Sequence, residues 1–149
     1  MIAVRCRLAQ ASDITGLLGM MASFNGLEQI AWNASDKRPA LARLLADSSL
    51  GAVALLERGD LTVGYFVLTW GYDLEWDGRD AFLTELFLEP EARGQGLGRQ
   101  ALELAEAVAR EHGGRALHLM VREDNHVARR LYAGCGYVSP PRIFLSKQL

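Results

Sequence analysis

One stretch of the chain changes its hydrophobic period at a glycine-rich turn, and this change constrains the fold more than any other feature. Asp80–Leu88 is rich in Phe and Leu and ends at Pro90, as expected for a buried strand. After the turn Gly94–Gly98, apolar residues recur at helical spacing as far as Val108, and Gly113-Gly114 ends that helix. A strand, a tight turn and a helix in this order predict an α/β domain.

Further elements are predicted on both sides of this unit. Helices are expected at Asp13–Phe24, at Pro39–Asp47 with Pro39 in its first turn, and at Val127–Tyr132. Strands are expected at Val4–Leu8, Gly51–Glu57, Leu61–Trp70, Leu117–Val121, Tyr137–Val138 and Ile143–Leu145. No linker, repeat or low-complexity tract divides the chain, so we expect a single domain over residues 1–149 with a mixed sheet.

Composition excludes several classes of protein. Sixteen Lys and Arg against eighteen Asp and Glu give a net charge of −2, which argues against a main role on nucleic acid or an anionic membrane. The longest apolar run, Leu50–Leu56, is far shorter than the roughly 18 residues of a membrane-spanning helix. Cys6 and Cys135 lack metal or redox spacing, and the three histidines form no zinc motif. We therefore expect a cytoplasmic protein with reduced cysteines and no metal.

The glycine-rich turn predicts an anion site. Free N–H groups at a helix start, together with the helix dipole, attract phosphate, and glycines allow the ligand to come close. A dinucleotide fingerprint requires a third glycine where this chain has Arg99, and no Walker A sequence occurs. A connector that binds nothing is the alternative. The pattern that does fit is Arg-x-x-Gly-x-Gly, from Arg93 to Gly98.

That pattern resembles the acyl-CoA motif of the GNAT superfamily of acyl-CoA-dependent N-acyltransferases. Its second signature, a strand followed by Asn, Ala and Tyr at fixed spacing, is matched by Val121, Asn125, Ala128 and Tyr132. Gly136-Tyr137 stands where the family has a Gly-aromatic step. The resemblance covers most of the chain. It implies a GNAT-like α/β fold: a mixed, mostly antiparallel central sheet of six to seven strands, about four helices, and splayed central strands that form the acyl-CoA cleft.

The resemblance also implies roles for particular residues in binding acetyl-CoA. Backbone amides of the turn would hold the pyrophosphate, and two arginines would add positive charge. The strand before the turn would offer main-chain groups to the thioester and the pantetheine arm. Asn125 would contact the cosubstrate; the alternative is a helix N-cap for Val127–Tyr132, and both roles can hold together. The expected acetyl-CoA site comprises Leu86, Phe87, Leu88, Arg93, Gly94, Gln95, Gly96, Leu97, Gly98, Arg99, Asn125 and Ala128.

Two residues are candidates for proton transfer. In this family the amine attacks the thioester directly, so a proton must leave the amine and another must reach the departing thiolate. Glu85, on the strand beside the expected thioester position, is the candidate base; an ordinary solvent-facing carboxylate is the alternative. Tyr132 matches the family's tyrosine near the sulfur and is the candidate acid; a core aromatic residue is the alternative.

The acceptor is predicted to be a small cationic amine. Positions 72–91 hold seven acids and one base, interleaved with aromatic residues, which favours a cation; a solvated loop is the alternative. Gly64–Gly98 resembles the polyamine-acetylating branch, but that branch usually has paired acids where this chain has Thr84-Glu85. A polyamine, an aminoglycoside or an amino acid is therefore expected. The predicted acceptor contacts are Phe24, Glu28, Trp32, Trp70, Tyr72 and Glu85.

Other functions stay open at this point. The domain could acetylate protein lysines or N-termini, or bind acyl-CoA as a sensor with little turnover. The presence of both Glu85 and Tyr132 favours an enzyme, because a binding module need keep neither. The resemblance also makes a homodimer an expectation, and Ile143–Leu145 is the segment through which copies could pair.

Overall fold

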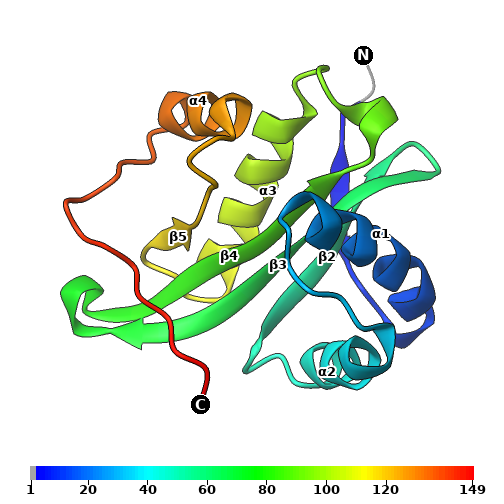
Figure 1. Ribbon diagram of the computed structural model, residues 1–149, viewed down its shortest axis with the longest axis horizontal. Helices are drawn as coiled ribbons and strands as arrows, with labels where there is room; N and C mark the ends of the chain where they lie inside the picture. Colours follow the sequence, from blue (N-terminus) through cyan, green and yellow to red (C-terminus); the bar gives the residue numbers. More distant parts are fainter. Residues whose placement is uncertain (1–2) are drawn as a thin grey trace.

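The computed structural model describes residues 3–149, which form one five-stranded mixed sheet (Figure 1). Its strands lie in chain order, with antiparallel pairing throughout except between the last two, which are parallel. They are β1 (Arg5–Leu8), β2 (Gly51–Arg58), β3 (Leu61–Asp73), β4 (Gly78–Leu88) and β5 (Leu117–Leu119). The expectation of six to seven strands is therefore wrong, while the mixed α/β class is confirmed.

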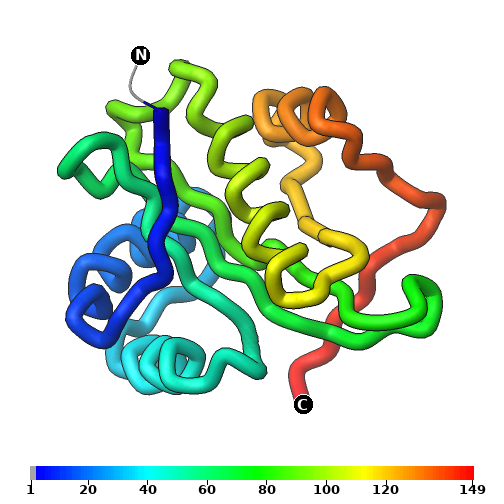
Figure 2. The backbone as a smooth tube through the Cα atoms, turned by 180° about the vertical axis from the view of Figure 1, so that it is seen from behind, coloured from blue at the N-terminus to red at the C-terminus, as the bar shows by residue number. Residues whose placement is uncertain are grey.

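The four expected helices are present and cover both faces of the sheet. Figures 1 and 2 show α1 and α2 packed on one face, with α3 and α4 on the other. The helices are α1 (Ile14–Leu27), α2 (Ala34–Ala46), α3 (Leu97–Glu111) and α4 (His126–Gly134). Pro39 lies inside α2 and not in its first turn as expected, because the helix begins at Ala34, five residues before the predicted start, where Asn33 caps it by accepting from the Ser35 amide.

Each face of the sheet has its own apolar core. Alternate residues of β2, Ala54 and Leu56, pack with the α3 side, whereas Val53 and Leu55 pack with α1 and α2. Because both faces are covered, the central strands read as nearly continuous apolar runs instead of alternating patterns. Full burial of such a side chain contributes about 1.5–3 kcal/mol. The sheet is therefore a rigid platform from which β4 extends toward the glycine-rich turn.

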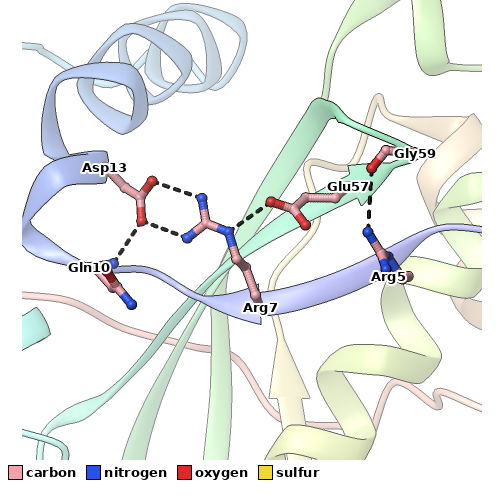
Figure 3. Close-up of polar contacts among 6 residues, drawn as sticks. All are labelled: Arg5, Arg7, Gln10, Asp13, Glu57 and Gly59. Atoms are coloured by element: carbon pink, nitrogen blue, oxygen red, sulfur yellow. Dashed lines mark hydrogen bonds and ion pairs between the residues drawn. The ribbon is translucent and has the colours of Figure 1, made fainter.

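Polar contacts tie the first strand to its neighbours (Figure 3). The Arg7 guanidinium bridges Asp13 at 2.8 Å and Glu57 at 2.7 Å. Asp13 also accepts from the Gln10 amide at 2.8 Å, which fixes the short turn that leads into α1. These pairs are largely exposed, so they orient the chain more than they stabilise it.

The C-terminal segment departs from the sequence prediction. The expected strands Tyr137–Val138 and Ile143–Leu145 do not form; after α4 the chain runs to the C-terminus without regular structure (Figure 1). Pro140-Pro141 cannot donate ladder hydrogen bonds. The segment also pairs with no other strand of the described residues. The β-forming residues are present but form no ladder with the sheet.

Candidate active site

Glu85 lies at an irregularity of β4 that changes the direction of the strand. Val67 of β3 pairs with Glu85 and the next residue, Leu68, pairs with Leu83, so Thr84 is an extra residue. Such a bulge locally re-aims side chains and is frequent next to active sites. As a result, Glu85 shares a face with Val67 and Phe87, toward α1 and α2, where a regular strand would have turned it to the α3 side.

The surroundings of Glu85 make it a base near neutral pH. Burial raises the pKa of its carboxyl from 4.5 to about 6, against smaller lowering effects from a hydrogen bond of Asn25 and the charge of Lys37. The Asn25 Nδ2 donates to Glu85 Oε1 at 3.5 Å and to the Met21 carbonyl at 2.7 Å. A carboxylate with this pKa is mostly ionised at pH 7 and still basic enough to take a proton.

After Leu83, β4 continues without pairing to β5. β5 pairs only with Ala81–Leu83, and its last residue is Leu119, so residues 84–88 of β4 lack a partner on that side among the described residues. The main-chain groups of β4 on this side are therefore not used by β5 from Thr84 onward. The side chains of Leu86 and Leu88 pack against the α3 core, whereas Phe87 is buried on the opposite face.

The glycine-rich turn has a backbone conformation that favours glycine at two of its positions. Gly94 and Gly96 have φ of 73° and 75°, in the left-handed region that favours glycine, and Gly96 is the N-cap of α3. Its first turn carries no acidic side chain. Arg93 donates through Nε to the Leu88 carbonyl at 2.8 Å and lies over the Phe87 ring. A helix N-terminus beside an arginine is suited to a pyrophosphate.

The remaining turn residues contact α4 and neighbouring segments of the chain. A Cβ on Gly98 would come within 3.0 Å of Leu131, so glycine lets α3 and α4 approach. The Arg99 guanidinium lies 3.5 Å from the Gly134 carbonyl. The side chain of Gln95 is held by the Glu91 carbonyl and by Arg58, and Leu97 is buried.

α4 brings Tyr132 toward the end of α1. Asn125 caps this helix by accepting from the Ala128 amide at 3.1 Å, so its structural role is established. Burial raises the pKa of Tyr132, and the charge of Glu28 raises it further, which keeps the phenol protonated. Arg122 Nη1 donates to the Glu28 carbonyl at 3.4 Å, a contact from the loop before α4 to the end of α1. Tyr132 and Glu28 therefore border one region.

The predicted acceptor aromatics are divided between the two faces of the sheet. Phe24 and Trp32 pack on the α1 and α2 side, as Glu85 does. Trp70 packs on the α3 side instead, stacked on His112 at 4.9 Å with its indole bonded to the Ser48 carbonyl. Tyr72 is 77% exposed. The structure thus brings Phe24, Trp32 and Glu85 to one face and leaves Trp70 and Tyr72 elsewhere.

Several hairpin acids already have partners. Asp73 caps the turn after β3, Glu75 pairs with Arg142 at 2.7 Å, and Asp80 pairs with His118 at 3.0 Å. The negative charge predicted to attract a cation is thus partly used within the fold. A cavity of about 620 Å³ adjoins this hairpin between α3, β5 and the C-terminal segment, on the opposite side of the sheet from the Glu85 carboxylate.

Two polar residues close to Glu85, Asn25 and Tyr65, were not singled out from the sequence. Asn25 falls in the apolar stripe of α1, where a core residue is expected, and that mismatch was the available signal. Tyr65 gave no signal, because an aromatic residue is normal in a buried strand.

Residues 3–149 contain no cluster of three His, Cys, Asp or Glu side chains suited to a metal ion. No helix of this part of the chain has the length and apolar character needed to cross a bilayer.

Comparison with known proteins identifies the family. Residues 18–137 match the acetyltransferase (GNAT) family. The chain therefore belongs to the GNAT acetyltransferases.

Individual relatives agree with this assignment. A thialysine N-epsilon-acetyltransferase from Bos taurus is 34% identical over 53% of this chain and 46% of its own length, so the match spans about half of that relative. The N-acetyltransferase YhfO of Bacillus subtilis is 29% identical over 88% of this chain and 87% of its own. An integron cassette protein from a salt-marsh metagenome superimposes with a TM-score of 0.84 and 30% identity, covering 97% and 90% of the two chains.

Proposed function

We propose that this protein transfers an acetyl group from acetyl-CoA to the primary amine of a small cationic molecule. The observation that carries the proposal is Glu85: a largely buried carboxylate with a pKa near 6, re-aimed by a bulge, at the point where β4 loses its pairing with β5. Neither a sensor nor a structural domain requires a base at this position. Family membership supplies the acetyl-CoA chemistry.

Acetyl-CoA would bind across the end of β4 and the start of α3. Backbone amides of residues 94–99 would hold the pyrophosphate, with Arg93 and Arg99 adding positive charge, and Leu86 to Leu88 would present main-chain groups to the thioester and the pantetheine arm. Asn125 and Ala128 would border the pantetheine from α4. The left-handed glycines and the acid-free helix start fit an anionic group.

The amine needs Glu85 because it is mostly protonated in solution. An alkylamine with a pKa of about 10.4 is neutral in roughly one molecule in 2,500 at pH 7, a shortage worth about 4.6 kcal/mol. Glu85 accepts the ammonium proton, and the amine nitrogen attacks the thioester carbon. The carbon–sulfur bond breaks as Tyr132 donates its proton to the departing thiolate. The second proton of the nitrogen passes through solvent to the Tyr132 phenolate, and Glu85 releases its proton to solvent, so the products are the amide, the CoA thiol and one proton.

The acceptor would lie between the end of α1 and Glu85, against Phe24, Glu28 and Trp32. The mammalian relatives are named for acetylating the ε-nitrogen of thialysine, and an amino-acid side chain of that kind is our first candidate. Polyamines and aminoglycosides follow. Trp70 has its packing role already, so we place it outside the acceptor contacts, and Tyr72 would contribute only to a long acceptor.

The test is thiol release from acetyl-CoA by the purified protein with thialysine, lysine, polyamines, aminoglycosides and lysine peptides. We expect release with one class of small amine. Glu85→Gln should slow release at least about 100-fold and Tyr132→Phe at least about 30-fold, both with little change in acetyl-CoA affinity. Release with lysine peptides alone would establish a protein acetyltransferase. Tight acetyl-CoA binding without release from any amine would favour the sensor.

We also propose a homodimer. Ile143 and Leu145 are 87% and 85% exposed, and the outer edge of β5 is unpaired in the part of the chain that the structure describes. Apolar, strand-forming residues beside an open strand edge favour pairing between copies. Light scattering of the whole protein should give twice the chain mass, and Ile143→Lys with Leu145→Lys should give a monomer. A wild-type monomer at micromolar concentration would refute it.

The remaining expectations concern location and partners. The cysteines Cys6 and Cys135 are unpaired in the structure, as befits a reducing compartment, so we propose the cytoplasm. The charge of −2 gives no reason to invoke nucleic acid or membrane partners.

A further inference from the structure

Asn25 is a polar side chain in a position that the fold otherwise reserves for apolar ones. It is 5% exposed, and no other polar side chain in residues 3–149 is as buried apart from Tyr65. It follows Leu18 and Met21 at helical spacing on the face of α1 that meets the sheet. Burying an amide costs free energy unless it is hydrogen-bonded, and a leucine would pack here without that cost. Its contacts should therefore explain why it is there.

Those contacts aim Asn25 at Glu85. One amide hydrogen goes to the Met21 carbonyl at 2.7 Å, within the same helix turn, and fixes the side chain. The same nitrogen lies 3.5 Å from Glu85 Oε1 on β4, sixty residues away in the chain. The Glu85 carboxylate on β4 thus has a hydrogen-bond donor from α1, the helix that packs on the same face of the sheet.

Tyr65 approaches the same carboxylate from β3. It pairs with Phe87 while Val67 pairs with Glu85, so Tyr65 and Glu85 are diagonal neighbours on one face of the sheet. The Tyr65 ring is fully buried, with its centroid 5.9 Å from that of Phe87. Its hydroxyl has no hydrogen-bond partner among the described residues. The charge of Glu85 adds to burial in raising the pKa of Tyr65, as expected if the two groups are near each other.

An unpartnered buried hydroxyl destabilises a fold, and phenylalanine would fill the same volume without it. A functional role for the Tyr65 hydroxyl would explain why tyrosine is present here despite this cost. We propose that Asn25 and Tyr65 are positioning residues for Glu85: the amide holds one carboxylate oxygen, and the hydroxyl is the donor toward which the ionised carboxylate turns before it takes the proton of the acceptor amine. This inference rests on the proposed function, in which Glu85 is the base.

Both donors favour the ionised carboxylate, so their loss should move its titration upward. The other charged group that acts on Glu85 is Lys37 from α2, which also favours ionisation; β3 contributes Tyr65, and α1 contributes the neutral Asn25. β5 pairs only with Ala81–Leu83 of β4, so it does not extend along the strand as far as Glu85. Lys37 is retained in every variant below, so a difference in pH profile reports on the two donors.

The test is the pH dependence of kcat/KM with the acceptor amine that gives thiol release. In Tyr65→Phe and in Asn25→Leu, we expect the acid limb to move to higher pH by about 0.5–1 unit, with kcat at pH 7 lower by about threefold to tenfold and the KM for acetyl-CoA unchanged. Tyr65→Phe should melt at the same temperature as the native protein or higher. Thr62→Val, which removes an exposed hydroxyl from the same strand, is the matched control and should keep the native profile.

The outcomes separate the two proposals. If Glu85→Gln is as active as the native protein, the base assignment fails, and this inference fails with it. If Glu85→Gln is inactive while Tyr65→Phe and Asn25→Leu keep the native acid limb, only the positioning roles are refuted. A marked loss of melting temperature in Tyr65→Phe with an unshifted profile would show that the hydroxyl is structural, which also overturns the inference. Because Tyr65→Phe preserves packing, it decides the matter even if Asn25→Leu does not fold.

Discussion

Replacing Glu85 should make the protein more stable at pH 8 while it removes activity. The folded-state pKa of about 6 lies above the ordinary value of 4.5, so the folded protein holds this proton more tightly than the unfolded chain does. The 1.5-unit difference, at about 1.36 kcal/mol per unit, means that ionised Glu85 destabilises the fold by up to about 2 kcal/mol. Glu85→Gln keeps an oxygen for Asn25 and carries no charge, so it should recover about 1–2 kcal/mol.

The sign of this effect fixes its pH dependence. Above pH 6 both states are ionised at this residue and the full penalty applies; below pH 4.5 both are protonated and the penalty is gone. Urea unfolding at pH 8, 6 and 4.5 should therefore show the advantage of Glu85→Gln shrinking toward zero as the pH falls. Glu91→Gln, at an exposed position, should show no such trend. A constant difference between Glu85→Gln and the native protein, or a variant less stable at pH 8, would refute the reasoning.

Three further predictions concern the surrounding framework. Gly96→Ala forces a side chain onto a residue with φ of 75°, so acetyl-CoA should bind about tenfold more weakly by calorimetry; native affinity would count against the turn as the pyrophosphate site. Asn125→Ala removes the cap of α4 and should lower the free energy of unfolding by about 0.5–2 kcal/mol in urea, whereas a neutral result would deny the cap any role in stability. Leu56→Ala, at a fully buried core position, should cost about 2–5 kcal/mol in the same assay, and a loss below about 1 kcal/mol would contradict the packing described.

The sequence predicted those parts of the fold whose determinants are local. The period change at Pro90 and the left-handed glycines fixed the β4–turn–α3 unit, because backbone conformation there depends on few residues. Helix ends were less accurate: α1 runs three residues past its predicted end at Phe24, to Leu27, since packing on the sheet outweighs the weak helix propensity of Gly26. The last strands were wrong because strand-forming residues also need a neighbour.

The candidate site was only partly predictable for the same physical reason. Glu85 could be chosen from its position on the strand, but the bulge that turns it toward α1 depends on the register between β3 and β4, which pattern alone does not determine. Trp70 and Phe24 looked equivalent as aromatic residues near acids, and only the sheet, by placing them on opposite faces, separates them. Asn25 acquires its role from a residue sixty positions away.

The bulge at Thr84 also explains how β4 would serve both ligands in the proposed function. Before it, Ala81 and Leu83 face α3 and pair with β5; after it, Leu86 and Leu88 face α3 again, but β5 is gone. The backbone edge freed by that loss is the edge that pairs with β5 in the earlier part of the strand. Glu85 projects from the opposite face, toward α1. A regular strand would place Glu85 on the α3 side, in the apolar core, so in the proposed function the extra residue is what would let Glu85 reach the amine while the strand edge meets acetyl-CoA.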